Sequence, residues 1–145
     1  MKLPFRTAVF LSMLAPVAWA AAPLPPVHVY KSPACGCCGK WVDHMKDSGF
    51  DVITHDTHNV VEHKTRLGVP VAMGSCHTAE VGGYLVEGHV PATDVKRLLA
   101  EKPSARGLAV PGMPASSPGM DSPRNIPYEV VLIGKSGATT TYARH

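Results

Sequence analysis

The sequence carries little net charge and, beyond its first twenty residues, no long apolar stretch. Its 145 residues have a formal charge of +3, which falls to about +1 when residues 1–20, with Lys2 and Arg6 but no acidic residue, are set aside. That balance gives no electrostatic basis for binding nucleic acid. No stretch after residue 20 could span a membrane, so we expect no stable membrane insertion. The part after residue 20 is long enough for one domain with one core and not clearly for two, and it contains no internal repeat.

The first twenty residues have the pattern of a cleaved secretory signal. Lys2 and Arg6 form a basic start, residues 8–17 are mostly apolar, and Ala18-Trp19-Ala20 is a small-x-small cleavage pattern. The apolar run is too short for a membrane anchor and contains a proline. We therefore predict a signal peptide over residues 1–20, a Pro-rich leader over residues 21–26, and one folded domain over residues 27–145.

Cysteine is scarce, but three of the four cysteines lie within four residues, at Cys35, Cys37 and Cys38. A strand-like segment precedes them and a helical pattern follows, which places them at the first turn of a helix. There, free backbone N–H groups and the helix dipole favour the thiolate. A bridge from Cys37 to Cys35 or Cys38 would close a very small, strained ring, which argues against a purely structural disulfide framework. Two bridges stay open, Cys35 with Cys38 or one cysteine of the trio with Cys76. The trio therefore indicates either a redox site or a metal site.

The remaining pattern predicts alternating strands and helices. Val27 to Tyr30 alternates as a strand does, and the first elements in the order βαβα favour a parallel strand pair. Asn59 with Glu62 is typical of a capped helix start, and Gly68 of a helix end. After the first strand, the pattern predicts a helix over 39–48, a strand over 50–54 and a helix over 59–68. These are followed by a strand over 81–90 with a Gly-Gly interruption, a helix over 91–102, and a terminal hairpin of strands 128–133 and 138–142.

Residues 105–127 are rich in Gly, Pro and Ser, and they include Met113 and Met120. Such a segment forms either an ordered loop over a site or a flexible strap. No helical spacing assigns these methionines to the core. A thioether is a good ligand for Cu(I), so Met113 is a candidate metal ligand.

Part of this pattern resembles the thioredoxin and glutaredoxin fold. Cys35 and Cys38 would be its two thiols at a helix start, and Pro70 would be its cis-proline. Two features depart from a redox enzyme of that kind. Cys37 is an extra thiol inside the motif, and Cys76-His77 has no counterpart in a plain thioredoxin.

A closer resemblance covers nearly the whole mature chain, in four separated blocks. The chain is similar to the CopG-type periplasmic copper-handling proteins in these blocks: Tyr30-Lys31-Ser32-Pro33-Ala34-Cys35-Gly36-Cys37-Cys38-Gly39-Lys40-Trp41, Ser75-Cys76-His77-Thr78-Ala79, Val86-Glu87-Gly88-His89-Val90-Pro91, and Gly107-Leu108-Ala109-Val110-Pro111-Gly112-Met113-Pro114. The resemblance implies a thioredoxin-like α/β fold, copper as ligand, a part in copper resistance, and a periplasmic location. Carried over by position, it points to these metal ligands: Cys35, Cys37, Cys38, Cys76, His89 and Met113.

The chemistry of these side chains agrees with copper. Thiolates and thioethers select Cu(I), imidazole binds either oxidation state, and adjacent thiolates can bridge more than one ion. We therefore expect a periplasmic copper-binding protein that sequesters or redox-cycles copper, as a copper oxidoreductase would, and that exchanges it with other periplasmic copper-handling proteins. The alternatives are a thiol–disulfide oxidoreductase using Cys35 and Cys38, and a small domain with structural disulfides.

The other histidines are weaker candidates. His77 could bind a metal or only orient Cys76, and its role stays open, as does that of Met120. The remaining histidines are expected to be solvated, and a loose metal cluster of His55, Asp56 and His58 is set aside.

Overall fold

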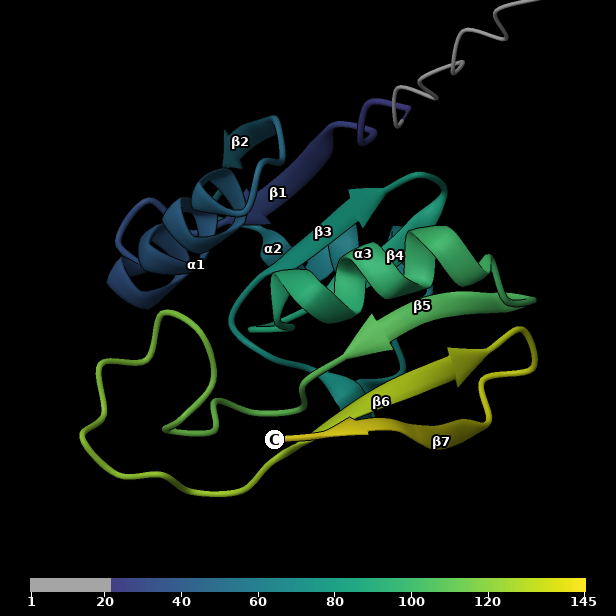
Figure 1. Ribbon diagram of the computed structural model, residues 1–145. Coiled ribbons are helices and arrows are strands. Elements are labelled where there is room, and N and C mark those ends of the chain that lie inside the picture. Colours follow the sequence, from purple (N-terminus) through teal and green to yellow (C-terminus); the bar gives the residue numbers. More distant parts are fainter. Residues whose placement is uncertain (1–21) are drawn as a thin grey trace, which may run out of the picture.

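The computed structural model describes residues 22–145, in which seven strands form one mixed sheet and three α-helices pack against it (Figure 1). Residues 22–26 form no helix or strand, and the expected signal peptide lies outside the described residues. In chain order the elements are β1 (Val27–Lys31), α1 (Gly36–Asp47), β2 (Val52–Asp56), α2 (Val60–Leu67), the 3-10 helix η1 (Val71–Met73), β3 (Thr78–Val81), β4 (Tyr84–Glu87), α3 (Ala92–Glu101), β5 (Ala105–Ala109), β6 (Glu129–Gly134) and β7 (Thr139–Arg144).

The strands lie in the order β2-β1-β3-β4-β5-β6-β7. β1 pairs with β2 in parallel through the crossover helix α1, and β4 pairs with β5 in parallel through α3. The remaining neighbours are antiparallel. Because β3 runs against β1, with Thr78 opposite Tyr30, the residues before β3 lie next to those after β1.

The two faces of the sheet are covered by different helices. α1 and α3 bury the larger core, in which Trp41 and Leu98 are fully buried with strand residues such as Val29. On the other face, the end of α2 and η1 contribute Leu67 and Met73 to a smaller cluster. The alternation of side chains along each strand supplies both faces.

Most predicted elements are confirmed, with shifted ends. α1 begins three residues earlier than expected, so Cys37 and Cys38 lie inside its first turn. The Asn59 side chain accepts a hydrogen bond from the Glu62 N–H at 3.3 Å, and α2 ends at the left-handed Gly68, both as predicted. The terminal hairpin is present as β6 and β7.

One strand prediction was wrong, and one strand was not predicted. The single strand expected over 81–90 is the hairpin of β3 and β4, which turns at Gly82-Gly83. β5 was missed because its composition resembles that of the loop that follows. Gly107 is needed inside this strand, since its φ is 155° and a Cβ there would collide with the Leu85 carbonyl group.

The expected mixed α/β fold in a single domain is confirmed, while the thioredoxin-like assignment stays a prediction. The expectation of a cis-proline at Pro70 was wrong, because no peptide bond within residues 22–145 is cis. Pro70 instead caps η1, where its carbonyl oxygen accepts the Met73 N–H at 2.8 Å. The trans bond is the ordinary state of an X–Pro peptide.

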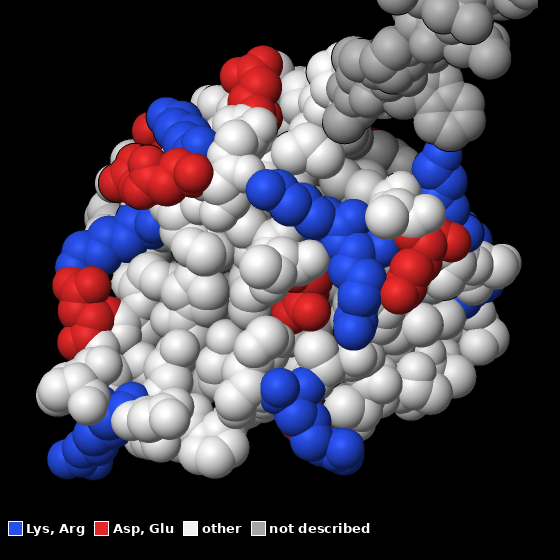
Figure 2. Space-filling view, in the orientation of Figure 1, with Lys and Arg blue, Asp and Glu red and all other residues white. Residues whose placement is uncertain are grey.

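On the face drawn in Figure 2, lysine and arginine side chains lie among aspartate and glutamate side chains, and most of the surface is uncharged. Among the helices of residues 22–145, none has the length and apolar character needed to cross a membrane.

Candidate metal centre

The cysteine trio lies at the N-terminus of α1, as the sequence predicts. Cys35 is the N-cap residue, with extended backbone and no side-chain capping bond, and the first turn contains no acidic residue. Cys38 is fully buried, whereas Cys35 and Cys37 are half-buried. The helix dipole and unpaired N–H groups at this end favour negative charge on sulfur.

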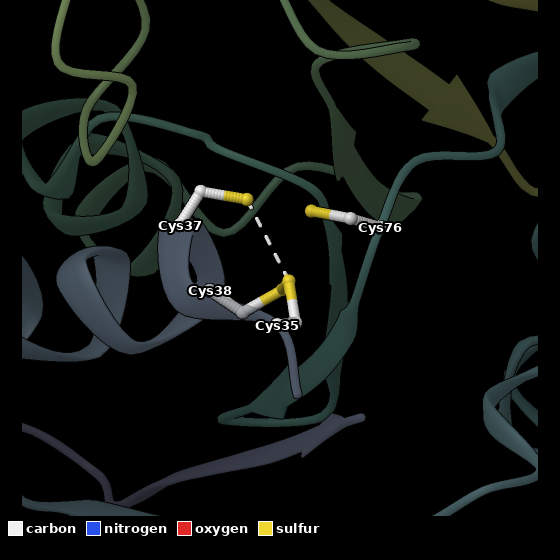
Figure 3. A group of neighbouring side chains, drawn as sticks. All are labelled: Cys35, Cys37, Cys38 and Cys76. Carbon is white, nitrogen blue, oxygen red and sulfur yellow. Dashed lines mark hydrogen bonds between the residues drawn. A yellow bond between two sulfur atoms is a disulfide. The ribbon is translucent and has the colours of Figure 1, made fainter. Parts of the chain in front are cut away.

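Cys35 and Cys38 form a disulfide with an S–S distance of 2.00 Å, and Cys37 and Cys76 are free thiols. Figure 3 shows the Cys37 and Cys76 sulfur atoms directed toward each other beside the disulfide. The Sγ atoms of Cys37 and Cys35 are 3.6 Å apart. The structure is therefore the oxidised form of the trio, and it adopts one of the two bridges that the sequence allowed.

Cys76 lies close to the trio because of the sheet register. It comes two residues before β3, whose antiparallel pairing with β1 carries it beside the segment that leads into α1. The sulfur atoms of Cys35, Cys37, Cys38 and Cys76 all lie within 4.8 Å of one another. Once the disulfide is reduced, four thiolates at this spacing can share one metal ion or bridge several.

Cys76 also belongs to a second group, formed with His77 and His89. Its Sγ is 2.9 Å from Nε2 of His89 and 3.4 Å from Nδ1 of His77, and the three ligand atoms lie within 4.8 Å of one another. The β3–β4 pairing brings these residues together. Thr78 lies opposite Glu87, so His77, directly before Thr78, comes near His89, two residues after Glu87. Cys76 therefore joins an all-sulfur group to a sulfur–imidazole group.

The ring of His89 is oriented by the Gly/Pro/Met-rich loop, which comprises residues 110–128 between β5 and β6. Its Nδ1–H donates to the Pro118 carbonyl oxygen at 2.6 Å, which leaves the lone pair of Nε2 directed at Cys76. Burial lowers the pKa of His89, so the ring is neutral at physiological pH. A neutral imidazole held by a carbonyl group through its other nitrogen is the usual arrangement of a metal-binding histidine.

His77 is fully buried between Trp41, at a ring-centroid distance of 4.5 Å, and His89, at 5.1 Å. Burial, followed by the nearby His89 ring, lowers its pKa well below the usual value. Its Nε2 has no hydrogen-bond partner within residues 22–145. Sequence reasoning left His77 unassigned, because its approach to His89 depends on the β3–β4 pairing, and that hairpin was predicted as a single strand.

The thiol of Cys76 is protonated in the metal-free protein. Burial, and then the neighbouring Cys37, raise its pKa to about 11. A metal ion bound here would displace that proton, which makes binding dependent on pH.

The two methionines occupy different positions. Met113 is 55% exposed. The preceding Gly112 donates its N–H to the Gly74 carbonyl oxygen and accepts the Ser75 hydroxyl, next to Cys76. Met120 lines a cavity of about 370 Å³ together with Cys37. Met113 therefore stays a predicted ligand, whereas the loop brings Met120 beside a free thiol.

The loop is ordered against the first turn of α1. Gly119, with a φ of 88°, packs so closely against α1 that a Cβ would lie 2.8 Å from both the Cys37 carbonyl oxygen and the backbone nitrogen of Trp41. Asp121 forms an ion pair with Lys40 on α1. Of the two forms that the sequence left open for residues 105–127, the part that follows β5 is thus an ordered loop over the site.

The buried carboxylate of Glu87 binds the backbone next to Cys76. Glu87 is fully buried at the end of β4, where it accepts the Ser75 N–H at 2.6 Å and pairs with Lys64 on α2. Sequence reasoning did not identify this contact, since a Glu in a strand is ordinarily exposed. The contact fixes the backbone immediately before Cys76.

The comparisons with known proteins identify the family of the chain. A family model described as "Protein of unknown function, DUF411" matches residues 73–120, which include Cys76, His77 and His89. No curated protein matches the chain. A solved structure named "Copper resistance protein copG- Form 2" is 43% identical, with a TM-score of 0.80, over 86% of this chain and 99% of that one. A second, named "Copper resistance protein copG- Form 1", is 42% identical, with a TM-score of 0.79, over 84% and 98%. With this identity over nearly the full length of both neighbours, the chain belongs to the CopG-type family of copper-handling proteins.

Proposed function

We propose that the chain binds copper as Cu(I) through its cysteine and histidine cluster and thereby acts in copper resistance. The observation that carries the proposal is the position of Cys76, whose sulfur lies within 4.8 Å of three other sulfurs and of two imidazole nitrogens. Sulfur is the donor that selects Cu(I) over harder divalent ions. The copper resistance proteins that the chain resembles support the same metal.

The proposed ligands are Cys35, Cys37, Cys38, Cys76 and His89, with Met113 as a thioether ligand from the loop. The cluster has room for more than one ion, because each thiolate can bridge. Nδ1 of His77 also lies near the Cys76 sulfur, and we include His77 in the cluster as a ligand or as a neutral neighbour of Cys76. Copper here is cargo, which other periplasmic copper-handling proteins would deliver or remove.

The location is proposed as periplasmic, on the basis of the signal-like residues 1–20. In an oxidising compartment the Cys35–Cys38 disulfide would form without a metal, so two electrons are needed to restore both thiols. Cu(I) storage and copper redox cycling both begin from that reduced state.

The second candidate is thiol–disulfide exchange with other proteins, which the disulfide at a helix N-terminus favours. Such an enzyme needs Cys35 and Cys38 and gains nothing from Cys37. A Cu(I) site does gain from it, because a serine hydroxyl is a poor Cu(I) ligand. Cys37 therefore separates the two functions.

The test is a competition titration of reduced protein against a Cu(I)-specific chelator, beside an insulin-reduction assay, for the parent chain and Cys37→Ser. We expect the substitution to lower Cu(I) affinity or stoichiometry at least about tenfold, the lower end of the range for changes around metal ligands. Thermal unfolding of both proteins checks that the fold is intact. Unchanged copper binding with strong insulin reduction in both proteins would favour the oxidoreductase.

A further inference from the structure

Two side chains of α1 bind the backbone that directly follows His89. Trp41 is fully buried, and its Nε1–H donates to the Val90 carbonyl oxygen at 2.9 Å. His44, three residues further along the helix, accepts the Ala92 N–H at its Nε2 atom, at 3.0 Å. Residues three apart lie on the same side of a helix. The two contacts therefore join the helix that begins at the cysteines to the segment that carries a proposed imidazole ligand.

The His44 contact completes the start of α3. Ala92 is buried at the first position of this helix, where a backbone N–H has no partner within its own helix. The N-cap residue is Pro91, whose side chain makes no capping bond. The acceptor comes from α1 instead, so His44 caps α3 from a different element. Without it the buried Ala92 N–H would lose its hydrogen bond, which is unfavourable, so the cap favours one position of this segment.

The cap requires a neutral imidazole. A backbone N–H can only donate, so Nε2 of His44 carries a lone pair and the ring proton is on Nδ1. Protonation at Nε2 would place one donor against another and break the bond. The side chain is half-buried, and burial lowers the pKa of His44 from its ordinary value of 6.5. The cap is therefore present at neutral pH and is lost in acid.

The charges around His44 leave Asp47 as the one that acts on its ring. The other ionisable groups considered, on α1, α3, the loop and the end of the β6–β7 hairpin, form two pairs of their own: Lys40 with Asp121, and Asp94 with His145. Asp47 lies one turn after His44 on α1 and favours the protonated ring, but burial has the larger effect on the pKa. Acid is therefore needed to protonate His44.

We propose that His44 is a positioning residue of the copper site, which holds His89 beside Cys76 by capping α3 and which weakens Cu(I) binding when acid breaks the cap. The inference rests on the proposed Cu(I) site. His89 can bind a shared ion only where its Nε2 faces the Cys76 sulfur, as it does at 2.9 Å. A contact that holds a ligand in place before the ion arrives reduces the ordering cost of binding. Whatever favours that position therefore also favours Cu(I).

The test is a competition titration of fully reduced, full-length protein against a Cu(I)-specific chelator, at about pH 7.5 and about pH 5. His44→Leu removes the acceptor, whereas the Oε1 atom of His44→Gln accepts an N–H but takes up no proton. At about pH 7.5, His44→Leu should bind Cu(I) about tenfold more weakly than the parent, and His44→Gln should retain most of the affinity. On acidification the parent should lose at least about threefold more affinity than His44→Gln, because both share the protonation of thiols and other histidines.

The exposed His58→Gln is the matched control and should follow the parent at both pH values. Thermal unfolding and hydrogen exchange of the Ala92 amide report on the cap itself, and exchange should be faster in His44→Leu than in the parent. A parent chain that binds no Cu(I) would overturn the proposed function. If the parent does bind Cu(I), equal pH profiles of the parent and His44→Gln, or lower stability with unchanged affinity in His44→Leu, would overturn the positioning role alone.

Discussion

Nε2 of His89 lies 2.9 Å from Sγ of Cys76, while the opposite nitrogen of the same ring donates to the Pro118 carbonyl oxygen. The contact connects the β3–β4 hairpin to the loop that covers the cysteines. It orients a neutral imidazole at the sulfur atom that the two candidate ligand groups share.

The first prediction concerns this imidazole. His89→Gln removes a nitrogen ligand but keeps a side chain of similar size, so Cu(I) affinity should fall at least about tenfold in a chelator competition. The exposed His58→Gln serves as control and should bind Cu(I) as the parent does. Equal affinity of parent and His89→Gln would remove His89 from the ligand set.

The second prediction concerns the disulfide. Copper needs thiolates, and the Cys35–Cys38 bridge removes two of them. Reduced protein should therefore bind Cu(I) in greater amount than oxidised protein, with thiol counts of four and two measured in parallel. Equal uptake by both forms would contradict a role for Cys35 and Cys38 as ligands.

The sequence predicted the position of Cys35, Cys37 and Cys38 at a helix start and most of the fold, because these depend on local patterns. The trio precedes a helical period, and Asn59 with Glu62 forms a cap within four residues. The strand over 81–90 failed because an apolar run with a Gly-Gly turn fits one interrupted strand as well as two short ones.

The rest depends on contacts between distant segments, which no local pattern reveals. Pro118 reaches His89 across 29 residues, and Lys64 reaches Glu87 across 23. Likewise His44 was expected to be solvated, yet its Nε2 accepts the Ala92 N–H at the start of α3. Such partners are fixed by the sheet order, which the sequence predicted only in part.

The third prediction concerns the reactivity of Cys76 in the metal-free protein. Its pKa is raised from the ordinary 9.0 to about 11, so at pH 8 its thiolate fraction should be about a hundredfold below that of an ordinary thiol. Alkylation of Cys76, followed by peptide mass mapping, should be slow at pH 8 and accelerate up to about pH 11. Cys37, which lines an open cavity, is the internal reference. An alkylation rate already at its plateau at pH 8 would contradict the buried thiol.

The fourth prediction concerns the close approach of the loop to α1. In Gly119→Ala the added Cβ collides with the Cys37 carbonyl oxygen, and the positive φ of residue 119 adds about 1–2 kcal/mol of strain for a residue other than glycine. Gly137→Ala has a comparable φ of 90° with nothing within 4 Å, so it isolates the strain from the collision. Gly119→Ala should lose more stability than Gly137→Ala and should also bind Cu(I) more weakly, because the loop can no longer hold His89. Equal effects in chemical unfolding and copper titration would show that the loop does not support the site.

The last prediction concerns the buried ion pair behind Cys76. Glu87 is fully buried and Lys64 has a side chain only 16% exposed, so removing either partner leaves a charge without compensation. Glu87→Gln and Lys64→Met should each lower the free energy of unfolding by about 3–5 kcal/mol. The double variant should lose less than the sum of the two, since it leaves no buried charge without a partner.

The exposed pair of Arg144 and Glu129, at 2.8 Å, is the matched control for this cycle. Glu129→Gln should lower the free energy of unfolding by less than about 1 kcal/mol, because solvent screens the pair. Glu87 also holds the Ser75 N–H at 2.6 Å, so Glu87→Gln should weaken Cu(I) binding in the fraction that stays folded, whereas Lys64→Met should weaken it less. Additive losses of stability in the cycle, or copper binding unchanged in Glu87→Gln, would mean that this carboxylate neither depends on Lys64 nor positions Cys76.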